Sequence, residues 1–279
     1  MRDDVRRLRL YFKSMALFRE KLASPSLAWW LPFLPAGRSM QIAMNSGRSF
    51  RIKGSEWPLL PSACRLEDIG ADFEFHADAK LVKIDGLRLY SPLWSREEAS
   101  YYKEVLLDDV YGIKSRDMKG ATVVDVGAYV GDSAVAFARQ GASVHAFEPA
   151  VSFCGFIRRN LKANALSHKV VLHEVGLSER SEEVVHRNDR LKFVEGVRYA
   201  LDNLPEAVDF LKLDCEGSEY HLLADPRFLA HLRPAEIRME YHRGKEPVAT
   251  YLLNAGYAVE HLSGTGPVGL LSARRKERQ

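Results

Sequence analysis

From residue 121 onward, short apolar runs alternate with amphipathic stretches. The runs of strand length are Thr122–Val126, Ser143–Phe147, Val170–Val175, Val208–Leu213 and Ile237–Tyr241. The helical patterns between them are Ser133–Gln140, Ala150–Ala165, Ser218–Leu223 and Pro247–Ala255. Strands that alternate with helices in this way predict a parallel α/β sheet with helices on both faces.

The end of the chain departs from this pattern. Two further apolar runs, Tyr257–Leu262 and Val268–Ala273, are joined only by Ser-Gly-Thr-Gly-Pro. A parallel pair needs a crossover of a dozen residues or more, so this last pair is predicted to be antiparallel.

The N-terminal segment has apolar residues at helical spacing with arginine and lysine between them, which predicts an amphipathic helix over residues 5–22. Such a helix can lie on a membrane surface or pack on its own domain with the basic face in solvent. We favour packing and keep peripheral membrane contact through residues 5–22 as the alternative. The paired Trp29 and Trp30 stand in a proline-rich stretch and are expected to pack under that loop.

Residues 72–92 alternate between apolar and polar positions, and Asp85-Gly86 in their middle predicts a β-hairpin. A polar, helix-prone stretch follows at Ser95–Asp109. We therefore divide the chain into an N-terminal α+β extension, residues 1–118, and a main domain, residues 119–279. The extension is predicted to cap the carboxyl ends of the main strands and to select the molecule that binds there.

The composition is that of an ordinary globular protein, with 279 residues, 46% hydrophobic and 28% charged. The longest apolar run, Leu27–Leu34, is far below the roughly 20 residues needed to span a bilayer, and the N-terminus is too charged for a secretory signal. Three widely spaced cysteines give no disulfide framework. These features predict a cytoplasmic protein with no transmembrane segment, and they leave the oligomeric state open.

The net charge of +3 is unevenly distributed. Residues 1–21 hold seven Lys/Arg against three Asp/Glu, and residues 272–279 hold four against one, so the body between them is slightly acidic. This is a poor footprint for nucleic acid. It favours a small-molecule or carbohydrate acceptor and no nucleic-acid partner.

The segment that carries most chemical information follows the run Thr122–Val126 and reads Gly-Ala-Tyr-Val-Gly-Asp-Ser. Its two glycines, Gly127 and Gly131, let the backbone approach a ligand at the carboxyl end of a strand. Asp132 or Ser133 is predicted to cap the next helix. The following strand ends in Glu148-Pro149. Glu148 comes 21 residues after Gly127, and an acid at this spacing is placed to accept hydrogen bonds from both hydroxyls of a ribose.

Two residues indicate which nucleotide binds. Tyr129 occupies the place of the second glycine of a dinucleotide fingerprint, which disfavours a pyrophosphate. Asp125 adds a negative charge that suits a cation. S-adenosylmethionine satisfies both conditions, since it has a ribose, a sulfonium and an ammonium but no phosphate. The predicted cofactor-binding residues are Asp125, Gly127, Ala128, Tyr129, Gly131, Asp132, Ser133, Glu148, Pro149 and Asp214.

Three alternatives remain open from these residues. The glycine turn could serve solely to pack a helix on the sheet, with no ligand bound. The chain could be an NAD-dependent oxidoreductase of Rossmann type, against which Tyr129 and the antiparallel last pair both count. It could also be a non-catalytic binding module that retains the fold.

The chain also resembles the FkbM-type methyltransferases, within the class I S-adenosylmethionine-dependent superfamily. The matching elements are Val124–Ala128, Gly131–Ser133, Ala146–Pro149, Asn160, Val175–Ser178, Phe210–Glu219 and Glu240–His242. The resemblance covers roughly residues 120–260, and relatives usually carry Asn where this chain has Tyr129. It implies a Rossmann-like sheet of seven strands in the order 3-2-1-4-5-7-6, with the last strand antiparallel. It also implies methyl transfer to oxygen, often to a sugar hydroxyl.

Ionisable residues follow the fourth and fifth strands of the predicted sheet, and parallel strands bring them to one rim. The catalytic candidates are His242, Asp214, Glu216 and Glu240, with Glu219 beside them. His242 is predicted to take the proton of an acceptor hydroxyl. Alternatively, Asp214, Glu216 and His242 hold a divalent metal, which we do not expect, or the acids cap the next helix and orient the cofactor. Cys215 is expected to be an inert, half-buried thiol.

Overall fold

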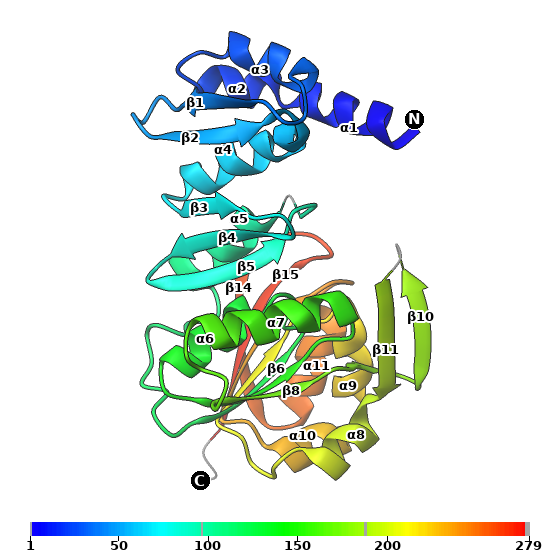
Figure 1. Ribbon diagram of the computed structural model, residues 1–279. Coiled ribbons are helices and arrows are strands. Elements are labelled where there is room, and N and C mark those ends of the chain that lie inside the picture. The colour runs from blue at the N-terminus through cyan, green and yellow to red at the C-terminus, as the bar shows by residue number, and fades with distance from the viewer. Residues whose placement is uncertain (1, 96, 187–188, 277–279) are drawn as a thin grey trace. The chain divides into compact units, whose positions relative to one another are not determined.

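The computed structural model describes residues 2–95, 97–186 and 189–276, with side chains from residue 8 onward. The chain forms two compact units (Figure 1). The first holds the chain up to Leu87 and Ser91–Lys103, and the second holds Arg88–Tyr90 and the chain from Glu104 onward. Residues 104–118 therefore group with the second unit, and the role of the extension as a cap stays a prediction.

The second unit is built on a seven-stranded sheet with the order β14-β15-β13-β12-β6-β7-β8. Five consecutive strands of this order pair in parallel, namely β13, β12, β6, β7 and β8. The strand β15 is antiparallel to both of its neighbours, β13 and β14. The predicted order 3-2-1-4-5-7-6 is confirmed. The strands are β6 (Thr122–Val126), β7 (Ser143–Phe147), β8 (Val170–His173), β12 (Phe210–Leu213), β13 (Glu236–Tyr241), β14 (Tyr257–Ser263) and β15 (Gly269–Arg275).

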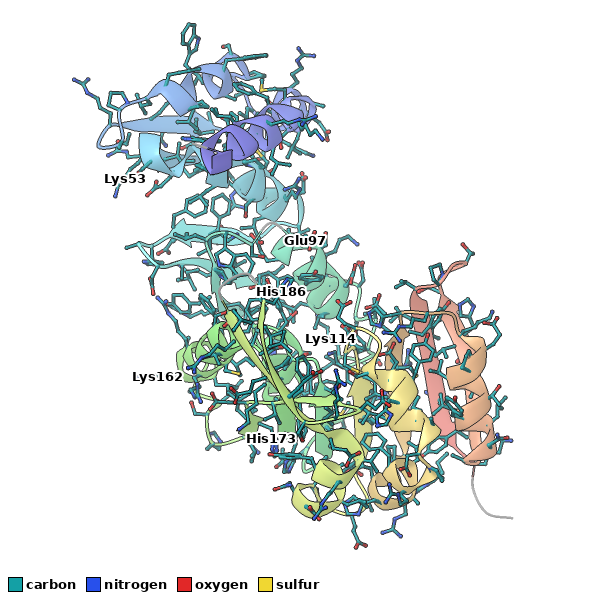
Figure 2. All side chains as sticks on the ribbon, turned by 90° about the vertical axis from the view of Figure 1, so that its right-hand side faces the viewer. Lys53, Glu97, Lys114, Lys162, His173 and His186 are labelled. Carbon is teal, nitrogen blue, oxygen red and sulfur yellow. The ribbon has the colours of Figure 1, made fainter. Side chains whose placement is uncertain are left out.

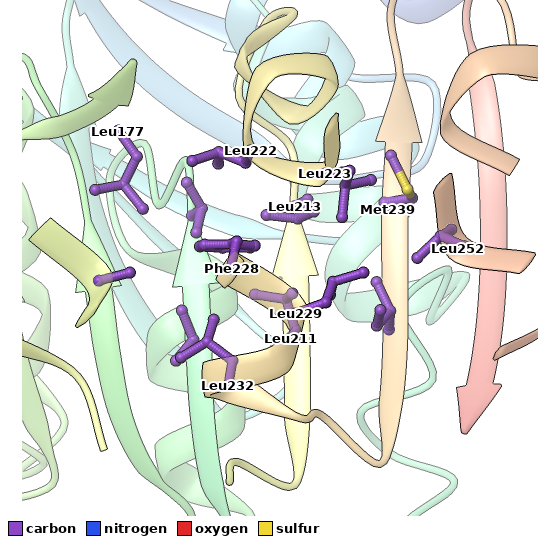
Figure 3. Packing of buried hydrophobic residues seen from close by; sticks show 14 of the residues in the cluster. Leu177, Leu211, Leu213, Leu222, Leu223, Phe228, Leu229, Leu232, Met239 and Leu252 are labelled. Atoms are coloured by element: carbon purple, nitrogen blue, oxygen red, sulfur yellow. The ribbon is translucent and has the colours of Figure 1, made fainter. Parts of the chain in front are cut away.

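Helices cover both faces of this sheet. One face is covered by α6 (Asp132–Arg139) and α7 (Val151–Ala163), and the other by α8 (Gly196–Asn203), α9 (Ser218–Ala224), α10 (Pro226–Leu232) and α11 (Glu246–Asn254). Side chains alternate between the faces along each strand. Leu211 and Leu213 of β12 pack against α9 and α10 (Figure 3), whereas the ring of Phe210 contacts Phe137 of α6. Lys212 points to the same face as Phe210, which places a charged side chain beneath α6.

A second, three-stranded sheet was not predicted. It consists of β9 (Gly176–Ser178), β10 (Glu182–His186) and β11 (Asp189–Glu195), in the order β10-β11-β9. Figure 2 shows His186 at the outer end of the β10–β11 hairpin. The backbone N–H of Lys192 in β11 donates to the carbonyl of Pro149 at 3.1 Å. The hairpin is therefore seated on the loop that follows β7.

The first unit begins with two helices, α1 (Arg2–Lys13) and α2 (Met15–Lys21), where the sequence pattern predicted one. The break falls at Ser14, whose hydroxyl donates to the carbonyl of Leu10. Tyr11, Met15 and Phe18 are buried in the core of this unit, so the apolar face of the segment packs on its own unit as favoured. The elements that follow are α3 (Ser26–Trp30), η1 (Leu31–Phe33), β1 (Ser39–Ala43), β2 (Ser49–Lys53), η2 (Gly54–Leu59) and α4 (Leu60–Asp68).

A three-stranded sheet comes next along the chain, formed by β3 (Asp72–Phe75), β4 (Ala79–Ile84) and β5 (Leu87–Pro92). Asp85 and Gly86 both have positive φ, as the predicted tight turn between β4 and β5 requires. A short helix, α5 (Glu98–Tyr102), and a π-helical segment, η3 (Lys103–Leu107), lie within the stretch predicted to be helical. Within the described residues, no helix is long and apolar enough to cross a membrane.

Candidate active site

Two positions of the glycine loop after β6 have backbone conformations that favour glycine. Gly127 has a φ of +85°, and a Cβ placed on it would lie 1.7 Å from the carbonyl oxygen of Asp214. Gly131, with a φ of +87°, is the N-cap of α6, and no side chain caps this helix. The prediction that Asp132 or Ser133 is the N-cap is therefore wrong. Both residues lie inside the first turn and are buried there.

Glu148, at the carboxyl end of β7, is 6% exposed and forms no ion pair within the described part of the chain. One carboxylate oxygen accepts the backbone N–H of Tyr129 and the other accepts that of Ala150, each at 2.9 Å. Burial raises the pKa of Glu148 to about 8 despite these two donors. A buried carboxylate with unused acceptor capacity fits two ribose hydroxyls, which would supply the missing donors.

Asp125 is fully buried and faces Lys212, a residue that the sequence analysis missed. The Nζ of Lys212 lies 3.0 Å from Oδ1 of Asp125, and the hydroxyl of Ser133 donates to Oδ2 at 2.7 Å. Lys212 also donates to the carbonyl of Gly127 at 2.9 Å. The negative charge expected to suit a cationic cofactor is therefore balanced by Lys212. Through Lys212 and Ser133, Asp125 braces the glycine loop.

Asp132 is the second acid buried beneath this loop. It is 4% exposed, and burial raises its pKa to about 7, although the charge of Lys212 opposes this shift. Asn160 of α7 holds the same loop from the other side, since its Nδ2 donates to the carbonyl of Val130 at 2.8 Å. Asn160 thus supports the loop, and Asp132 places a buried carboxyl at the start of α6.

Tyr111 is a second residue that the sequence analysis missed. Its hydroxyl donates to Oδ2 of Asp214 at 2.9 Å, and its ring lies 5.1 Å from the Nζ of Lys212. Burial raises the pKa of Tyr111 well above its ordinary value, and the charge of Asp214 acts in the same direction. The phenol therefore stays protonated and holds the carboxylate of Asp214 at the end of β12.

His242, after β13, is oriented by Glu219 at the start of α9. The Oε1 of Glu219 lies 2.9 Å from Nδ1 of His242 and accepts the backbone N–H of the same residue at 3.1 Å. Its Oε2 accepts the N–H of Gly217 at 2.8 Å. Burial alone would raise the pKa of Glu219, but the hydrogen bonds from His242 and the backbone lower it. An ionised carboxylate only accepts, so Nδ1 carries the proton and Nε2 is left as the free ring nitrogen.

Three carboxylates surround Nε2 of His242. Asp214 lies 3.8 Å away, Glu216 3.9 Å and Glu240 4.0 Å. Burial would lower the pKa of His242, but the hydrogen bond to Glu219 and the neighbouring carboxylates raise it on balance. Burial, reinforced by the charge of Asp214, raises the pKa of Glu240 to about 7. The structure thus brings together all four predicted catalytic residues.

The same group contains a set of side chains with metal-ligating chemistry. Among the described residues, ligand atoms of Asp214, Glu240 and His242 all lie within 4.8 Å of one another. The alternative metal site had Glu216 in place of Glu240, but the side chain of Glu216 is 92% exposed. Cys215 has its pKa raised well above its ordinary value, first by burial and then by Glu219 and Asp214. This supports the expectation that its thiol is inert.

Residues 125–259 match the family model for the methyltransferase FkbM domain. A comparison with curated proteins finds no match.

Three solved structures are among those similar to this chain. One is methyltransferase FkbM from Methylobacillus flagellatus KT, with 20% identity, coverage of 62% of this chain and 46% of that one, and a TM-score of 0.47. A SAM-dependent O-methyltransferase from Thermotoga maritima has 13% identity, coverage of 88% and 96%, and a TM-score of 0.48. The ribosomal protein L11 methylase from Lactobacillus delbrueckii subsp. bulgaricus has 19% identity, coverage of 60% and 76%, and a TM-score of 0.44.

The family match is located on the glycine loop, Glu148 and the acidic rim, and it disfavours the oxidoreductase alternative. The sequence resemblance is confirmed: residues 125–259, nearly half of the chain, are similar to the methyltransferase FkbM domain.

Proposed function

We propose that this chain transfers a methyl group from S-adenosylmethionine to a hydroxyl of a small polyhydroxylated acceptor, such as a sugar or a glycan. The observation that carries the proposal is the orientation of His242. Its Nδ1 is hydrogen-bonded to Glu219, while its Nε2 faces the carboxylates of the rim. In this arrangement a carboxylate holds a histidine base in one tautomer, as in other enzymes that use a histidine–carboxylate pair.

The cofactor pocket in this proposal is formed by the glycine loop and the end of β7. Glu148 accepts the ribose hydroxyls. Tyr129, whose backbone N–H donates to that carboxylate, and Pro149, the next residue along the chain, line the ribose and the base. Gly127 and Ala128 offer backbone groups, and Asp214 faces the methionine portion. Asp125 and Ser133 fix the loop, because the Asp125 carboxylate is engaged by the Ser133 hydroxyl and by Lys212, and Gly131 and Asp132 form the start of α6 beneath the cofactor.

When bound, S-adenosylmethionine supplies a methyl group on a sulfonium, already a good leaving group, so the protein mainly aligns an in-line attack and excludes water. The acceptor hydroxyl loses its proton to Nε2 of His242 as its oxygen bonds to the methyl carbon and the bond from carbon to sulfur breaks. Glu219 stabilises the imidazolium that results. Asp214, Glu216 and Glu240 accept further hydroxyl protons and orient the acceptor.

The charge of the rim supports a neutral or cationic polyol. Asp214, Glu216 and Glu240 line it, and Lys212, the nearest buried cation, is already paired with Asp125. A phosphate or a nucleic-acid backbone would be repelled there. This favours a hydroxylated acceptor and no nucleic acid. The alternative in which Asp214, Glu240 and His242 hold a divalent cation predicts a different response to chelators.

Transfer of a labelled methyl group tests the proposal directly. The protein is incubated with methyl-labelled S-adenosylmethionine and a panel of monosaccharides and glycosides, with amines and a short RNA as comparison acceptors. We expect label in methyl ethers of the hydroxylated acceptors, and transfer slower by roughly 10²–10⁴-fold with His242→Ala. Label on nitrogen or carbon, or equal transfer by His242→Ala, would contradict the proposal.

A further inference from the structure

Three aromatic side chains of the first unit are exposed together. Trp29, Trp30 and Phe33 are 49%, 68% and 70% exposed, and they follow one another through α3 and η1. Residues three and four apart share one side of a helix, so these three rings form one surface, the exposed aromatic cluster. The expectation that the paired tryptophans pack under their loop is wrong for Trp30.

The backbone beneath this cluster is firmly held. Ala28 and Leu31, on the inner side of the same segment, are fully buried. The hydroxyl of Tyr11 in α1 donates to the carbonyl of Ala28 at 2.8 Å, and the ring of Phe12 lies 5.3 Å from that of Trp29. The inner residues thus account for most of the packing of α3, and the rings of Trp30 and Phe33 lie largely outside the core. Large apolar side chains exposed together mark an interaction surface.

Basic residues stand beside the cluster on α1. Arg9 and Lys13 are exposed, are four residues apart, and flank Phe12, the residue that contacts Trp29. Residues 1–21 hold seven Lys/Arg against three Asp/Glu. A cationic helix therefore adjoins a set of exposed tryptophan and phenylalanine rings.

We propose that this surface binds anionic lipid membranes. Tryptophan settles at the level of the lipid head groups, where its ring is apolar and its indole N–H stays hydrated, and phenylalanine inserts a wholly apolar ring beside it. Basic side chains next to them are attracted to a negatively charged leaflet. The contact differs from the membrane alternative predicted for residues 5–22, because the apolar face of that segment is buried in its own unit.

Single-stranded nucleic acid is the competing partner, since it also uses basic and aromatic residues. It needs rings arranged as a platform for successive bases. Here the ring of Trp29 is tilted by 35° against that of Phe12 and is engaged with it, and Trp30 and Phe33 lie on one short helical segment. The arrangement favours insertion into a lipid interface.

Vesicle binding tests the proposal and requires no methyl transfer, so its outcome is independent of the proposed function. The full chain is sedimented with phosphatidylcholine vesicles with and without phosphatidylserine, at low and high ionic strength. We expect binding to the anionic vesicles, weakened by salt, and a blue shift of tryptophan emission. Trp30→Ala/Phe33→Ala should weaken binding by about tenfold or more, and Arg9→Glu/Lys13→Glu should do the same at low salt.

Two control variants share the chemistry but lie elsewhere. Trp94→Ala removes a ring that is 67% exposed, and Arg180→Glu/Arg198→Glu reverses two exposed charges of the second unit. Both should bind vesicles as the wild type does. Equal loss in the controls, or undiminished binding by Trp30→Ala/Phe33→Ala, would overturn the proposal. So would binding of a single-stranded oligonucleotide that depends on Trp30 and Phe33 while vesicles are not bound.

Discussion

One carboxylate oxygen of Glu219 contacts His242 at two points, the ring Nδ1 at 2.9 Å and the backbone nitrogen at 3.1 Å. Two contacts to a single atom fix both the position and the tautomer of the imidazole. They also join the start of α9 to the end of β13, the two places from which the rim is built. The arrangement explains why Glu219, the most buried acid of the rim, is ionised while Glu240 has a raised pKa.

The buried pair of Lys212 and Asp125 should be essential for stability. Lys212→Met leaves the carboxylate of Asp125 buried without its cation, and we expect a loss of about 3–5 kcal/mol in the free energy of unfolding. Denaturant titration measures this loss. The double variant Asp125→Asn/Lys212→Met should recover much of it, because no unpaired charge remains. A Lys212→Met protein as stable as the wild type would show that the pair does not brace the loop.

Cofactor binding should release a proton from Glu148. Its pKa is raised to about 8, so the carboxyl is largely protonated at neutral pH, whereas accepting two ribose hydroxyls requires the ionised form. Affinity for S-adenosylmethionine should therefore increase with pH up to about 8. Calorimetry in buffers of different ionisation enthalpy should give different binding enthalpies for the wild type.

The matched variant for this prediction is Glu148→Gln, which keeps the size of the side chain. Its binding enthalpy should not depend on the buffer, and its affinity should fall, because each hydrogen bond to a charged group contributes roughly 1.5–3 kcal/mol. Buffer-independent enthalpies in the wild type would remove Glu148 from the ribose site.

Chelation should leave turnover unchanged. The Oδ2 of Asp214 already accepts a hydrogen bond from Tyr111 and lies 3.9 Å from the Nζ of Lys212. The positive charge of this lysine weakens the attraction of the carboxylate for a metal ion. Activity is measured after dialysis against a chelator, with and without added Mg²⁺ or Mn²⁺. Loss of activity that either metal restores would favour the divalent site at Asp214, Glu240 and His242.

The parts of the site that the sequence predicted are local along the chain. β6, the glycine loop and the end of β7 at Glu148 were predictable, because a strand, a turn and a helix follow one another within a few residues. The pairing of Tyr111 with Asp214 was not, since 103 residues separate them and Tyr111 lies in an irregular segment before β6. Lys212 did carry a signal, because a lysine between two leucines of a buried strand needs a partner.

Other elements were missed for physical reasons of a different kind. β9 has only three residues, β10 is largely exposed and β11 is half-buried, so none of the three presents a strong apolar pattern in the sequence. α10 did have a start signal, Asp225-Pro226, and Asp225 accepts the backbone N–H of Arg227 at 3.0 Å. α8 begins with an unusual cap, Glu195, whose side chain accepts the N–H of Arg198.

The pH dependence of methyl transfer tests the central claim, that His242 is a base positioned by Glu219. A base must be neutral to act, so the rate should fall as the pH drops below the pKa of His242, which Glu219 and the rim carboxylates raise above its ordinary 6.5. With an acceptor identified from the panel, kcat/KM is measured against pH for the wild type, Glu219→Gln and His242→Ala. Glu219→Gln should move this acidic limb to lower pH and reduce turnover, because the charge that raises the pKa is gone. His242→Ala should abolish the limb and lower turnover by roughly 10²–10⁴-fold, with unchanged affinity for S-adenosylmethionine. An acidic limb that stays in place in both variants would contradict the account.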